Sequence, residues 1–186
     1  MFSNDNLNSI IYIPGRDINL SIELNQSGYT RNLLSFLIDF SKENNYNLFY
    51  YHSSHKKLFF KDTNSDLIDK ESLSKYINNI NPEILIGMSY GASLVEYFSC
   101  LKKIKSISIG GSIRHLDLNK NYVFDRSINV FNCINSKYVF NVIGSRDGDF
   151  ENNYYHINNL KIYKGHHYIT NEAINNIKTI LYEEID

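Results

Sequence analysis

A G-x-S-x-G motif at residues 87–91 constrains this chain more than any other feature of its sequence. The residues before it, 83–86, form a short apolar run with β-branched members, which is typical of a strand buried on both faces. After it, apolar residues recur at helical spacing, namely Leu94, Val95, Phe98 and Leu101. A strand, a sharp turn and a helix in this order hold the serine in a strained conformation and project its hydroxyl from the sheet. We therefore interpret Ser89 as a nucleophile, the alternative being a glycine-rich turn of any α/β protein.

The rest of the chain alternates between strand-like and helix-like patterns. Strands are expected at residues 9–13, 46–51, 83–86, 105–109, 138–143 and 159–163. Helices are expected at residues 29–44, from 65 or 66 to 80, after the motif, and from 170 or 171 to 181. This alternation predicts an α/β fold with a mostly parallel sheet of about six strands and helices on both faces. A length of 186 residues suits one domain spanning 1–186.

Composition excludes several classes of partner. The net charge of -1 gives no basic surface for nucleic acid or an anionic membrane. No stretch approaches the roughly 18 apolar residues of a membrane span, and the first residues lack a secretory signal pattern. The two cysteines, Cys100 and Cys133, have no C-x-x-C spacing and make no disulfide framework. We therefore expect a protein of a reducing compartment, the cytoplasm.

Polar residues with catalytic potential follow the last two predicted strands. Asp147 comes shortly after residues 138–143, and His166 and His167 come shortly after residues 159–163. Sites in parallel sheets form beyond the carboxyl ends of the strands, so these residues should converge on Ser89. A serine hydroxyl needs a general base such as imidazole, and the base needs a carboxylate to fix its tautomer.

Three segments together resemble the α/β-hydrolase superfamily. Residues 87–91, then 144–147 (Gly-Ser-Arg-Asp), then 165–168 (Gly-His-His-Tyr) follow the superfamily's order of serine, acid and histidine. The compact length, Pro14-Gly15 and Ala92 are similar to small lidless serine hydrolases, including the retinoblastoma-binding-protein-like group. The resemblance implies an α/β-hydrolase fold with a minimal lid, because the segment 110–136 is short.

The resemblance also implies roles for individual residues. Ser89 would be the nucleophile, since it is the serine of the motif. For the acid and the base the resemblance favours Asp147 and His167, with Asp149 (and more distantly Asp117) and His166 as the alternatives. The backbone N–H of Tyr90 would be one donor of the oxyanion hole. The second would come from Arg16, or alternatively Asp17, although Pro14 stands where this superfamily often has histidine.

These residues predict a serine hydrolase, an esterase or thioesterase that cleaves a small-molecule acyl substrate through an acyl-enzyme. No metal or other cofactor is expected, because adjacent histidines rarely chelate one ion and no third ligand is suitably spaced. Activity should rise with pH as the base loses its proton. Two alternatives remain: an acyltransferase or biosynthetic thioesterase with a non-water acceptor, and a catalytically silent binding protein. The sequence makes no prediction about oligomeric state.

Overall fold

The sheet is entirely parallel. A computed structural model describes residues 8–15, 29–51, 63–110, 133, 135–147, 157–167 and 169–184. Its six strands lie in the order β2-β1-β3-β4-β5-β6, and each neighbouring pair is parallel. The strands are β1 (Ser9–Ile13), β2 (Asn47–Tyr50), β3 (Ile84–Met88), β4 (Lys105–Ile109), β5 (Val139–Gly144) and β6 (Leu160–Tyr163). The predicted α/β class with about six strands is confirmed.

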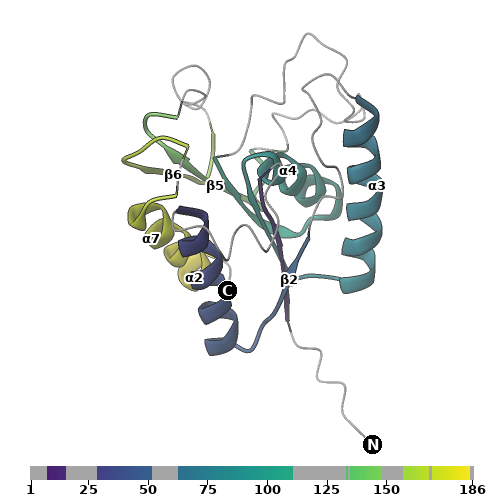
Figure 1. The fold of residues 1–186 in the computed structure, drawn as a ribbon, viewed down its shortest axis with the longest axis horizontal. Helices are drawn as coiled ribbons and strands as arrows, with labels where there is room; N and C mark the ends of the chain where they lie inside the picture. The colour runs from purple at the N-terminus through teal and green to yellow at the C-terminus, as the bar shows by residue number, and fades with distance from the viewer. Residues whose placement is uncertain are drawn as a thin grey trace, which may run out of the picture.

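Helices cover both faces of this sheet. The described helices are α2 (Tyr29–Glu43), α3 (Thr63–Ile80), α4 (Tyr90–Lys102) and α7 (Asn171–Thr179), which continues as a π-helical turn, η2 (Ile180–Glu184). In Figure 1, α2 and α7 lie on one side of the sheet, and α3 and α4 lie on the other.

The hydrophobic core is divided between these two faces. Ile10 and Tyr12 of β1 join the cluster under α2 and α7, whereas Ile11 and Ile13 join the cluster under α3 and α4. Successive strand residues point to opposite faces, so a strand covered on both sides is largely apolar on both faces. All five residues of β1 and of β3 are accordingly buried.

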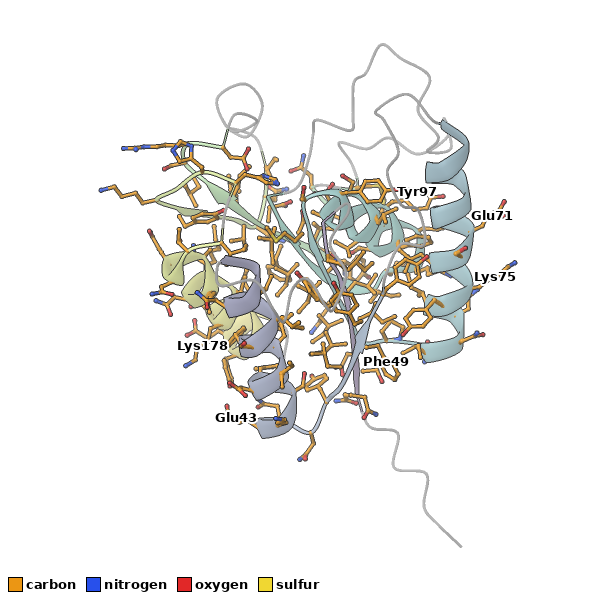
Figure 2. The ribbon with its side chains drawn as sticks, viewed as in Figure 1. Glu43, Phe49, Glu71, Lys75, Tyr97 and Lys178 are labelled. Carbon is orange, nitrogen blue, oxygen red and sulfur yellow. A yellow bond between two sulfur atoms is a disulfide. The ribbon has the colours of Figure 1, made fainter. Side chains whose placement is uncertain are left out.

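Helix α3 illustrates how one amphipathic face meets the sheet. Leu73 and Ile77, four positions apart, are buried in the core. Glu71 and Lys75 lie on the outer face of α3 and point away from the sheet, as Figure 2 shows. The helix begins at Thr63, slightly before the predicted start at Ser65 or Asp66.

The strand order reverses between β1 and β3. The chain passes from β1 outward to β2, then returns across the sheet to β3 on the other side of β1. In parallel sheets, ligand sites typically form beyond the carboxyl ends of the strands at such a switch point. Pro14 follows β1 and Ser89 follows β3, so both lie at this switch point.

The segment boundaries follow the sequence pattern closely. The predicted strands at 9–13 and 105–109 coincide with β1 and β4. Thr170 is the N-cap of α7, and its hydroxyl accepts a hydrogen bond from the Ala173 N–H at 3.2 Å. Most of the segment 110–136, predicted as a minimal lid, lies outside the described residues.

The cysteines form a disulfide, which corrects the sequence-based expectation. Cys100 on α4 is bonded to Cys133, with 5.0 Å between the Cα atoms and a sequence separation of 33. Spacing along the chain gave no sign of this pair, because only the fold brings the end of α4 beside the residues that precede β5. The argument for a reducing compartment loses its basis, and the cytoplasmic location stays a prediction. Across the helices that the structure describes, none combines the length and apolar character needed to cross a membrane.

Candidate active site

Ser89 occupies a strained backbone conformation between β3 and α4. Its φ of 55° and ψ of -116° lie outside the regions that residues with a side chain normally adopt. Such a conformation costs about 1–3 kcal/mol and persists only where surrounding contacts impose it. One of these contacts is the hydrogen bond from the Ser89 N–H to the Ile109 carbonyl at 2.9 Å, which ties the turn to β4. The strained turn predicted from the motif is confirmed.

The two glycines of the motif are needed because neighbouring backbone leaves no room for a side chain. A Cβ on Gly87 would lie 2.8 Å from the Ala92 backbone nitrogen, within the turn itself. A Cβ on Gly91 would lie 2.6 Å from the Pro14 carbonyl oxygen, at the end of β1. Both distances are shorter than real Cβ contacts allow. Gly91 therefore lets the start of α4 pack directly on the strand next to β3.

The predicted oxyanion donors are only partly described. Tyr90 is the first residue of α4, so the helix itself provides no acceptor for its backbone N–H. A helix N-terminus also stabilises negative charge. Arg16 and Asp17 lie outside the described residues. Pro14, two residues before Arg16, packs against Gly91 of the motif.

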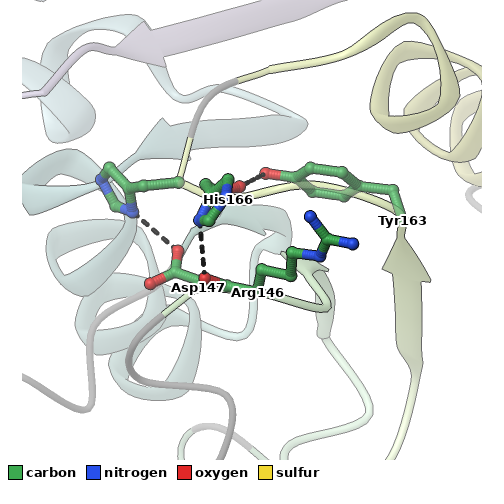
Figure 3. A network of polar contacts seen from close by, with 5 residues as sticks. Arg146, Asp147, Tyr163 and His166 are labelled. Carbon is green, nitrogen blue, oxygen red and sulfur yellow. Dashed lines mark hydrogen bonds and ion pairs between the residues drawn. The ribbon is translucent and has the colours of Figure 1, made fainter.

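Asp147 and His167 form a hydrogen-bonded pair. The His167 Nδ1 lies 2.7 Å from the Asp147 Oδ2, drawn as the dashed line at Asp147 in Figure 3. The Asp147 side chain is 1% exposed and that of His167 is 31% exposed, so a buried carboxylate orients a ring that solvent still reaches. An ionised carboxylate only accepts, so Nδ1 donates, and Nε2 of a neutral ring is then free of a proton. This is the tautomer that a general base requires.

His166 points to a different partner. Its Nδ1 lies 3.0 Å from the carbonyl oxygen of Arg146, to which it donates, and its side chain is exposed. Of the two adjacent histidines, His167 is therefore the one that Asp147 orients. Asp149, Asp117 and Tyr168 lie outside the described residues.

Gly110 connects the serine turn to the acid–base pair. It follows Ile109, which accepts the hydrogen bond from Ser89, and a Cβ on it would lie 3.1 Å from the His167 ring. Ser89 and His167 thus lie against consecutive residues, Ile109 at the end of β4 and Gly110 after it. Among the described residues, no hydrogen bond joins the Ser89 hydroxyl to either histidine ring. Catalytic contacts of this kind are often loose in the absence of substrate.

Two buried polar residues were not singled out from the sequence. Glu96 is buried within α4 and accepts a hydrogen bond from Ser108 of β4; burial raises its pKa to about 7, and the hydrogen bond opposes this rise. Tyr163 ends β6, and its pKa is raised to about 12, mainly by burial and secondly by the negative charge of Asp147. The one sequence signal for Glu96 is a carboxylate within an otherwise apolar helix pattern. The sequence of β6 contains no pattern that distinguishes Tyr163.

No cluster of three or more histidine, cysteine, aspartate or glutamate side chains suited to a metal occurs in the described part of the chain. The arrangement at the carboxyl edge instead combines a strained serine, a helix N-terminus and an oriented imidazole. Those groups are suited to nucleophilic acyl chemistry.

Comparison with known proteins identifies the fold. No protein-family model and no curated protein matches the sequence. Among solved structures, Est1E from Butyrivibrio proteoclasticus superposes with a TM-score of 0.57 at 14% identity, covering 94% of this chain and 86% of that chain. The esterase domain of a Rhodothermus marinus protein gives 0.54 at 11% identity, covering 96% and 84%. An uncharacterized protein from Bacillus cereus ATCC 10987 gives 0.61 at 18% identity, covering 99% and 61%.

With its parallel sheet and these matches, the chain has the α/β-hydrolase fold. The predicted resemblance is confirmed at that level, and esterases are among the structures that share the fold. The finer similarity to the retinoblastoma-binding-protein-like group stays a prediction.

Proposed function

We propose that this protein is a serine hydrolase that cleaves a small ester or thioester through an acyl-enzyme. Ser89 is the nucleophile, His167 the general base and Asp147 the residue that orients the base. The observation that carries the proposal is the 2.7 Å hydrogen bond between buried Asp147 and His167, at the same edge of the sheet as the strained Ser89. The similarity in fold to esterases supports the same reaction class.

The reaction would proceed in two displacements. His167 Nε2 removes the hydroxyl proton as Ser89 Oγ bonds to the acyl carbon, and the carbonyl electrons move onto oxygen. Backbone N–H groups of Tyr90 and of Arg16, or alternatively Asp17, donate to that oxyanion. The alcohol or thiol leaves with the proton from His167. Water then attacks the acyl-enzyme by the same route, which releases the acid and restores the serine.

A fluorophosphonate probe tests the nucleophile. The native chain should be labelled at Ser89, as located by mass spectrometry of its peptides, and Ser89→Ala should not be labelled. Ser35→Ala is the matched control, because Ser35 is an exposed serine on α2 and not part of the serine turn. Removing a triad serine typically costs about 10⁶-fold in turnover.

An unlabelled but folded native chain would contradict the proposal and favour a catalytically silent binding protein. If labelling succeeds, product analysis with added alcohol or amine acceptors separates the hydrolase from an acyltransferase. Transfer to the acceptor in preference to water would favour the second.

A further inference from the structure

The turns that carry Asp147 and His167 pack directly on each other. The Ser145 N–H donates to the Tyr163 carbonyl at 2.8 Å, and the Arg146 N–H donates to the Gly165 carbonyl at 2.7 Å. A Cβ on Gly144 would lie 2.6 Å from the Gly165 carbonyl oxygen, so this approach requires glycine. Backbone contact thus brings the end of β5 against the residues that follow β6.

Two side chains join these turns one residue away from the acid–base pair. The Tyr163 hydroxyl donates to the His166 carbonyl at 3.0 Å, and the His166 Nδ1–H donates to the Arg146 carbonyl at 3.0 Å, as Figure 3 shows. Arg146 immediately precedes Asp147, and His166 immediately precedes His167. The two hydrogen bonds therefore fix the peptide units from which the acid and the base project.

Each donor can carry the proton that its hydrogen bond requires. The Tyr163 ring is 1% exposed and packs in the core under α2 and α7, so its hydroxyl is anchored. Its pKa of about 12 keeps the phenol protonated and able to donate near neutral pH. A carbonyl can only accept, so His166 needs a proton on Nδ1, which both the neutral ring and the imidazolium can supply.

We infer that Tyr163 and His166 are positioning residues that set the geometry of the Asp147–His167 pair. They act through the two turns and not on the substrate. The inference rests on the proposed function for its kinetic consequence. Its structural consequence is independent of that function: without the two bonds, the His167 ring loses its fixed orientation toward Asp147.

Three variants separate the hydrogen bonds from side-chain volume. Tyr163→Phe removes only the hydroxyl. His166→Leu keeps a side chain of similar size but has no donor, whereas His166→Asn places an amide nitrogen close to the position of Nδ1. Lys164→Ala, at an exposed position of the same turn, is the control.

The kinetic measurement uses a p-nitrophenyl ester, with active sites counted by fluorophosphonate titration. Tyr163→Phe and His166→Leu should each lower kcat by about 10- to 100-fold, the cost of misplacing reacting groups. KM should stay within about twofold of the native value, because neither residue contacts substrate. His166→Asn should recover most of the activity, an outcome impossible if His166 itself were the base.

The second measurement does not depend on activity. Long-range ¹H–¹⁵N spectra of protein labelled at histidine report the tautomer of His167, assigned with His167→Gln. The native chain, His166→Asn and Lys164→Ala should each show the Nδ1–H tautomer. Tyr163→Phe and His166→Leu should show a mixture with the Nε2–H form. If Tyr163→Phe fails to fold, the exposed position 166 still provides the test.

The inference is overturned if His167 keeps its native tautomer in both donor-less variants, or if His166→Asn behaves like His166→Leu. Failure of the native chain to react with the probe would overturn the proposed function alone. In that case, the tautomer comparison still decides whether the two residues orient the pair.

Discussion

At the scale of single residues, the candidate site depends on backbone positions that tolerate no side chain. Ser89 holds its strained φ and ψ because α4 begins directly against β1 and β4. Gly91 makes that approach possible, since a Cβ there would meet the Pro14 carbonyl oxygen at 2.6 Å. The geometry of Ser89 thus depends on Gly91, a neighbouring residue that takes no part in the chemistry.

Gly91→Ala should therefore destabilise the fold and impair the serine turn together. In an open helix, alanine would be favoured over glycine by about 1 kcal/mol. Here the clash with backbone should reverse that sign and cost about 1–3 kcal/mol. Urea denaturation and the rate of fluorophosphonate labelling measure the two effects.

Gly165→Ala is the matched control for that variant. A Cβ on Gly165 would come no closer than 3.2 Å to any neighbour, the side chains of Thr170 and Tyr163, whereas a Cβ on Gly91 would meet backbone at 2.1 Å. Gly165→Ala should therefore lose clearly less stability than Gly91→Ala. Equal stability of Gly91→Ala and the native chain would contradict the steric argument.

At the scale of elements, α4 connects the site to the interior. Its residues from Tyr90 to Ser99 are all buried, with the serine turn at its start and the disulfide near its end. The buried Glu96 accepts a hydrogen bond from Ser108, which pairs with Gly87 across β3 and β4. A carboxylate is therefore enclosed between this helix and the strand beside the serine turn.

Glu96 should make stability fall as pH rises. Its pKa is about 7 in the folded chain, against 4.5 for an exposed glutamate. Between these values the folded state holds a proton that the unfolded state has lost, so the free energy of unfolding decreases with pH until about pH 7. Relative to the native chain, Glu96→Gln should gain about 2–3 kcal/mol between about pH 4.5 and pH 8.

Urea denaturation across that pH range provides the measurement. Glu71→Gln removes a carboxylate from the exposed face of α3 and should change stability by less than about 0.5 kcal/mol. If the difference in the free energy of unfolding between Glu96→Gln and the native chain does not vary with pH, Glu96 does not have a raised pKa in the folded state.

At the scale of the whole molecule, the disulfide joins parts of the chain that are distant in sequence. Cys100 and Cys133 close a loop with a sequence separation of 33 between the end of α4 and the approach to β5. A crosslink of this length restricts the unfolded chain and stabilises the fold by about 3–4 kcal/mol in the chain-entropy model.

Protein purified in air should therefore contain no thiol that reacts with Ellman's reagent under denaturing conditions. Reduction should lower the midpoint of urea unfolding. The Cys100→Ser/Cys133→Ser double variant should match the reduced chain and show no response to reductant. Recovery of both thiols per chain after purification in air would contradict the disulfide.

The local elements of this protein could be predicted from its sequence alone. An apolar run defines β1 and helical spacing defines α7, because burial of a strand or of one helix face imposes a pattern on neighbouring residues. The motif at 87–91 predicted the strained Ser89, since the sharp turn is encoded by five consecutive residues. The order of serine, acid and histidine along the chain predicted that residues following β3, β5 and β6 would form the site.

Tertiary structure decided the relations between distant residues. It selected His167 over its neighbour as the partner of Asp147, joined Cys100 to Cys133, and brought Tyr163 beside the turn that carries the acid. The resemblance favoured His167 with His166 as the alternative, and the direction of the two side chains decides which of them Asp147 orients. That direction depends on how the turns after β5 and β6 pack, which no short stretch of sequence encodes.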